Sequence, residues 1–157
     1  MPLDNPSPEE NLNKLRLVLP AAPKPGGNYL SHRQAGKTLY LAGIISFLDG
    51  EPTWVGQVGA ERTLEDGYQA ARVCALNALA TLRSILGSLD RVKQILFVSG
   101  YVNAIPAFAQ SPGAINGASD LFAEVFREAG LHARAAVAVA GLPRNATVEI
   151  QVTLEVE

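Results

Sequence analysis

The stretch TLEDGYQAARVCALNALATLRSILG, residues 63–87, decides the fold class together with the run QILFVSGY, residues 94–101. In the first stretch, Thr63 and Asp66 have the spacing of a capping box, and Gly87 ends the apolar pattern. The apolar residues that recur at helical spacing are Leu64, Tyr68, Ala71, Ala75, Ala78, Leu82 and Ile85. Residues 63–87 are therefore predicted to form a helix whose alanine-rich face lies close to a sheet, and residues 94–101 a strand of that sheet.

Strands and helices alternate on both sides of this pair. A second helix is predicted from Pro112 to about Ala129, and strands are predicted at 135–140 and 148–156. Upstream, residues 29–34, 39–45 and 53–55 predict three antiparallel strands joined by turns. Alternating strands and helices imply two right-handed crossovers, with both helices on one face of a mixed six-stranded sheet. The predicted fold class is α+β.

The first part of the chain has a different character. Six of the ten prolines fall between Pro2 and Pro25, which argues against a regular core element there. Ser7 and Glu10 form a second capping-box signal around Pro8, so a short helix is predicted from Pro8 to about Arg16. We therefore expect an N-terminal extension over residues 1–27, ending in an extended connector, and a main domain over residues 28–157.

Composition limits the partners of this chain. Its 157 residues, 48% of them hydrophobic, suffice for one domain with a sizeable core. The formal net charge is −2 and no basic block is present, so nucleic acid is not expected as a partner. A single cysteine cannot form an internal disulfide, and no segment is apolar enough for a membrane span, so we expect a cytoplasmic protein. With helices on one face only, the open sheet face predicts self-association.

Several residues of chemical interest have ordinary interpretations. Gly36 to Thr38 match the end of a phosphate-binding loop, but such a loop must be followed by a helix and a strand is predicted here. A hairpin turn is therefore favoured. Cys74 lies among alanines of the first long helix and is predicted to pack in the core. His32 and His132 stand far apart in the sequence without paired carboxylates, so we expect surface roles, no metal site and no cofactor. No Ser, His, Asp arrangement is recognised.

Arg134 and Glu149 carry the functional hypothesis. Arg134 precedes an uncharged run, residues 135–140, where a guanidinium needs an anionic partner such as a ligand carboxylate. Glu149 opens a strict alternation of polar and apolar residues that is typical of a strand with one wet face. From these patterns alone, a surface arginine and a solvated strand face are the favoured interpretations.

The segments HARAAVAVAGLP (132–143) and VEIQV (148–152), with the order of elements, resemble the reactive intermediate deaminase family, YjgF-type proteins also called endoribonuclease L-PSP. The resemblance covers about residues 29–157. It implies a chorismate-mutase-like fold, a homotrimer with ligand clefts between subunits, and no cofactor. The implied reaction is hydrolysis of reactive 2-imino or enamine acids to 2-keto acids and ammonia.

The resemblance also implies roles for single residues. Arg134 matches the arginine that grips the substrate carboxylate, and Glu149 the acid that holds or activates water. The predicted substrate-binding residues are Tyr29, Gly43, Asn116 and Ala136, the match of Asn116 requiring one extra residue before Arg134. Ala42 and Ile44 replace a serine and a glutamine common in the family, which predicts a more apolar cleft and a larger substrate, or weak activity.

Geometry adds a condition for a shared site. If residues 135–140 and 148–156 formed a simple hairpin, Arg134 and Glu149 would share a face about 13 Å apart, too far for one small ligand. A shared site therefore requires another strand between them or a strong twist. Two alternatives to a deaminase stay open, a non-catalytic trimer that binds a small carboxylate or a partner protein, and an endoribonuclease that inhibits translation.

Overall fold

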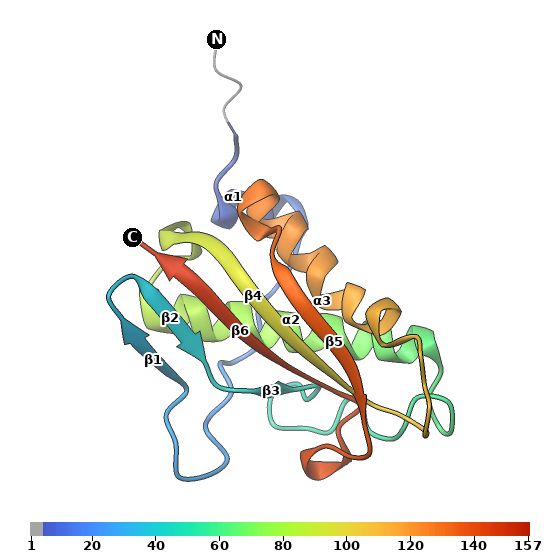
Figure 1. The fold of residues 1–157 in the computed structure, drawn as a ribbon. Helices are drawn as coiled ribbons and strands as arrows, with labels where there is room; N and C mark the ends of the chain where they lie inside the picture. The colour runs from blue at the N-terminus through green and yellow to red at the C-terminus, as the bar shows by residue number, and fades with distance from the viewer. Residues whose placement is uncertain (1–4) are drawn as a thin grey trace.

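The computed structural model describes residues 5–157 and shows an α+β fold (Figure 1). One mixed sheet of six strands carries two long helices on one face, and a short helix precedes it. The helices are α1 (Pro8–Lys14), α2 (Leu64–Leu86) and α3 (Ser111–Phe126), and the strands are β1 (His32–Ala35), β2 (Thr38–Leu41), β3 (Ile44–Ile45), β4 (Val92–Asn103), β5 (Ala133–Val139) and β6 (Val148–Val156). The predicted fold class is confirmed.

The last strand inserts into the middle of the sheet. The strand order is β1-β2-β6-β4-β5, and β3 pairs with β6 beside β2. β4 and β5 are parallel, whereas β6 is antiparallel to β2, β3 and β4. Since β4 lies between β5 and β6, the last two strands do not form a hairpin.

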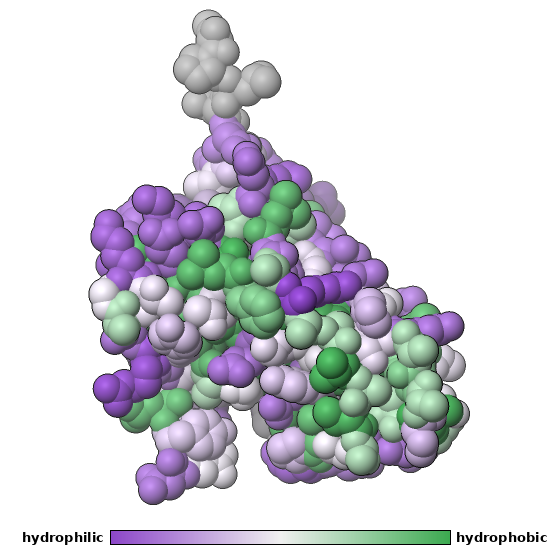
Figure 2. Space-filling model, in the orientation of Figure 1, coloured by the Kyte–Doolittle hydropathy of each residue, from purple (hydrophilic) through white to green (hydrophobic). Residues whose placement is uncertain are grey.

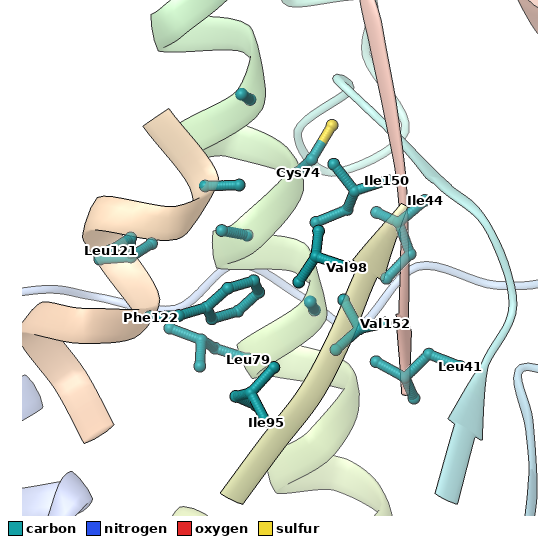
Figure 3. Packing of buried hydrophobic residues seen from close by; sticks show 14 of the residues in the cluster. Leu41, Ile44, Cys74, Leu79, Ile95, Val98, Leu121, Phe122, Ile150 and Val152 are labelled. Atoms are coloured by element: carbon teal, nitrogen blue, oxygen red, sulfur yellow. The ribbon is translucent and has the colours of Figure 1, made fainter. Parts of the chain in front are cut away.

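The long helices follow their local sequence signals. Thr63 and Asp66 form the capping box of α2, and Gly87 ends the helix in the left-handed conformation with φ 81°. The core between these helices and the sheet is apolar, as Figure 3 shows around Phe122, Val98 and Ile150. Cys74 is fully buried there, as predicted, and burial raises the pKa of its thiol.

Gly117 lets α2 and α3 approach each other closely. A Cβ atom at this position would lie 1.9 Å from the backbone oxygen of Tyr68. Neither backbone can yield without moving a whole helix, so we expect Gly117→Ala to lower the free energy of unfolding by about 1–3 kcal/mol. Urea denaturation of both proteins would measure this change.

Gly113→Ala is the matched control on the same helix. Its Cβ would meet only the Leu64 side chain, at an ordinary 3.5 Å. Alanine is the better helix former, so this variant should be neutral or up to about 1 kcal/mol more stable. Equal stability of the two variants would contradict the close-contact argument.

The N-terminal segment is anchored by specific polar contacts. The capping box of Ser7 and Glu10 is formed, and α1 is two residues shorter than the expected limit at Arg16. Glu9 pairs with Arg83, and the Asn11 side chain donates to the carbonyl of Val125. The following connector has no regular structure and is tied at Ala21, whose N–H donates to Asp49 Oδ1 over 3.1 Å.

The predicted strand at residues 53–55 is wrong. Val55 forms only an isolated bridge with Ala146, and the Trp54 carbonyl accepts from Thr147 N–H. The edge of β6 beside these residues is already occupied by β3, so they bond instead to the loop before β6 and, through Trp54 N–H, to the carbonyl of Ser46 after β3. Gly56 at φ 103° ends the extended run. The predicted strand 39–45 is likewise divided into β2 and β3.

The second face of the sheet carries no helix from residues 5–157. Strand pairing places Tyr40, Phe97 and Val137 on it, and these side chains are 47%, 39% and 45% exposed. Figure 2 views this face and shows apolar groups between polar ones. Within residues 5–157, no helix has the length and apolar character needed to cross a membrane.

Candidate active site

Glu149 lies on the open face of the sheet at a break in the neighbouring strand. It pairs with Ile45 of β3, and the chain between β2 and β3 bends at Ala42 and Gly43. A Cβ at position 43 would lie 2.8 Å from Glu149 Oε2, so a glycine is needed for the carboxyl group to occupy this place. The side chain is half-buried, and desolvation raises the pKa of Glu149.

A cavity of about 720 Å³ opens beside Glu149. Its walls come from the bend at Gly43, from Tyr29, from the loop before β6 and from the N-terminal connector, and they are mainly apolar. The Tyr29 hydroxyl is held in place by Gly26 N–H at 3.0 Å. The fold therefore brings together three of the predicted site residues, Tyr29, Gly43 and Glu149.

Arg134 lies elsewhere, on the helix side of β5. It pairs with Val98, whose side chain is buried beneath the helices. The guanidinium donates from Nη1 to Ser119 Oγ over 3.0 Å and from Nη2 to the Pro112 carbonyl over 3.3 Å. Both acceptors belong to α3, so Arg134 is held against this helix at the edge of the sheet.

A Ser–His pair orients this arginine, and sequence reasoning missed it. Ser119 Oγ is 2.9 Å from His132 Nε2, and His132 Nδ1 is 2.7 Å from the Gly130 carbonyl. Because a carbonyl only accepts, Nδ1 carries the proton, Nε2 accepts from the Ser119 hydroxyl, and Ser119 Oγ accepts from Arg134. Burial lowers the pKa of His132 and so favours the neutral ring. The two-residue spacing of His132 and Arg134 was the only signal in the sequence.

The remaining predicted residues lie on the Arg134 side. Asn116 is exposed on α3, one turn before Ser119, and Ala136 follows Arg134 on the same face of β5. The predicted site is thus divided into a Glu149 half and an Arg134 half on one chain. Within residues 5–157, no cluster of three or more His, Cys, Asp or Glu side chains is arranged to hold a metal ion.

The two halves do not meet within one chain. Glu149 pairs with Tyr101 and Arg134 with Val98, three residues apart along β4 and on opposite faces of the sheet. Two strand spacings and three residues of strand rise put their Cα atoms about 14 Å apart. One small ligand therefore cannot contact both groups of a single chain.

Residues 9–156 match the family model described as "YjgF/chorismate mutase-like, putative endoribonuclease". The chain belongs to this family. The predicted resemblance is confirmed, and so is the chorismate-mutase-like character of the fold.

Individual proteins are similar to this chain along nearly its whole length. Protein TCP17 of Trypanosoma cruzi is 42% identical over 146 residues, covering 92% of this chain and 91% of that protein. A structure from Shewanella oneidensis, titled a putative endoribonuclease, superposes with TM-score 0.92 and 35% identity over 96% of this chain and 100% of that one. RidA from a Psychrobacter species is more distant, with TM-score 0.58, 25% identity and coverage of 86% and 94%.

Proposed function

We propose that this YjgF-family protein hydrolyses reactive 2-imino and enamine acids to 2-keto acids and ammonia in clefts between identical subunits. The observation that carries the proposal is the division of the site. Tyr29, Gly43 and Glu149 line a cavity on one surface, whereas Arg134 and its supporting pair lie on another. A second copy of the chain that brings its Arg134 to the Glu149 cavity would complete a site in which one ligand contacts both charged groups.

The chemistry follows from the two charged groups. The guanidinium of one subunit binds the planar carboxylate of the imino acid. Glu149 of the other accepts a proton from water as its oxygen attacks the imine carbon, and the proton then moves to the nitrogen. The hydroxyl proton of the resulting amino alcohol then moves to its amino group, the C–N bond breaks, ammonia leaves, and the 2-keto acid remains. Imine and water supply all atoms, so the reaction calls for no cofactor.

The open sheet face supports assembly of subunits. Its apolar side chains Tyr40, Phe97 and Val137 lie on the same face as Glu149. Burial of this face against another copy removes apolar area from water and brings a second chain near the cavity. A homotrimer, cyclic and closed, is the arrangement that we propose.

Ammonia release tests the proposed activity. An amino-acid oxidase generates imines from amino acids, and the purified protein should accelerate the appearance of ammonia above the spontaneous rate. Tight binding of a 2-keto acid without acceleration would favour the alternative of a non-catalytic carboxylate-binding protein. Salt-sensitive RNA cleavage that is lost in a Glu149 variant would favour the endoribonuclease.

A further inference from the structure

Arg144 lies at the rim of the cavity that contains Glu149. Both residues line this cavity, yet they form no ion pair with each other. Among residues 5–157 the ion pairs are Arg72–Glu124 and Arg83–Glu9, so Arg144 has no carboxylate partner in the described chain. A free guanidinium beside an apolar cavity is suited to an anionic group of a ligand.

The backbone and an aromatic ring hold Arg144 in place. Arg144 and Asn145 both have left-handed backbone conformations, with φ 54° and 57°. Asn145 is fixed by two contacts, since its carbonyl accepts from Gly56 N–H over 2.9 Å and its side chain accepts from Asn103 over 3.2 Å. The guanidinium carbon lies 4.6 Å from the centre of the buried Phe47 ring, a cation–π contact. The cation is therefore ordered before any ligand arrives.

Much of the wall of this cavity is apolar. Ile45, Phe47 and Pro143 line the cavity together with Ala21 to Pro23 of the connector. Its volume of about 720 Å³ exceeds what a three-carbon imine fills, and is in the range of sites for larger organic ligands. The cavity thus has room for the body of a ligand that contacts both Glu149 and Arg144.

We infer that Arg144 selects 2-imino acids whose side chain ends in a carboxylate. This inference names the substrate class of the proposed deaminase and rests on that proposed function. The imine carbon lies beside Glu149, the methylene groups contact the apolar wall, and the terminal carboxylate binds the Arg144 guanidinium. Arg134 of a neighbouring copy binds the other carboxylate, which is next to the imine.

Binding of two stable product analogues tests the inference without turnover. Isothermal titration calorimetry with 2-oxoadipate and 2-oxohexanoate compares equal carbon chains with and without the terminal carboxylate. The wild-type protein should prefer the diacid by about tenfold or more, as expected for one charge-assisted hydrogen-bonded contact. Arg144→Gln should bring the ratio of the two affinities close to one and leave the affinity for 2-oxohexanoate unchanged.

Lys24→Gln is the matched control, because Lys24 is a second cation on the wall of the same cavity. This variant should keep the preference for the diacid. An unchanged preference in Arg144→Gln, a preference lost only in Lys24→Gln, or a wild-type protein that binds both acids equally would overturn the inference while the proposed deaminase stands. Failure of the wild-type protein to bind either acid would also overturn the inference, whereas the deaminase would be overturned only by a lack of acceleration in the ammonia-release assay.

Discussion

Replacement of Glu149 by glutamine is expected to lower the rate of ammonia release by about 100-fold or more, the usual contribution of a general base. Glutamine has the same shape, so the contact with Gly43 is retained, but its amide cannot accept a proton from the attacking water. The measurement is kcat for an imine generated in place by an amino-acid oxidase. The fold of the variant should be unaltered by circular dichroism.

Glu155→Gln provides the control for this substitution. Glu155 lies on the same strand and the same face, and its carboxylate accepts from Gln94 over 2.7 Å, away from the cavity. This variant should keep the wild-type rate. Equal rates for the Glu149 variant and the wild type would show that Glu149 is not the base.

The raised pKa of Glu149 also predicts how the rate depends on pH. Below this pKa the carboxyl is protonated and cannot act as a base, so the rate should fall as the pH decreases through it. Because burial raises the pKa, the midpoint should lie above the ordinary value of 4.5. The residual rate of Glu149→Gln should lack this acidic limb, and a limb that persists there would assign the titration to another group.

Mixing two impaired variants is expected to restore activity. Arg134→Ala should lose about 1.5–3 kcal/mol of substrate binding, the value of a hydrogen bond to a charged group. If Arg134 and Glu149 act from different subunits, random exchange between equal amounts of Arg134→Ala and Glu149→Gln leaves roughly a quarter of the interfaces with both groups intact. Ammonia release should then recover to about that fraction of the wild-type rate.

Subunit exchange must be verified in the same samples, for example by native mass spectrometry of chains with different mass tags. The comparison is a mixture of Glu149→Gln with the double variant Arg134→Ala, Glu149→Gln. Every chain in this mixture lacks Glu149, so no interface can contain both groups and no activity should return. Exchange without recovery in the first mixture would refute a site shared between subunits. The roughly 14 Å between the two Cα atoms within one chain would then leave no common site for one small ligand.

Local patterns predicted the elements whose signals lie within one segment. The capping box and Gly87 fixed the ends of α2, and strict alternation marked β6 over its full length. Residues 53–55 show the limit of such patterns, because an extended segment becomes a strand only where a free strand edge lies beside it. β3 occupies that edge, and no local signal reports this competition.

The candidate site also shows what local patterns predict and what they do not. The amino-acid sequence alone identified Arg134 and Glu149 as the charged pair of interest, since each stands in a motif of contiguous residues. Only the tertiary structure decided that β4 separates them on opposite faces, that Ser119 and His132 hold Arg134, and that Arg144 shares the cavity of Glu149. The physical reason is that strand order and side-chain contacts join residues far apart along the chain. The free energy of packing the whole sheet and its helices selects those contacts, and no short segment contains that information.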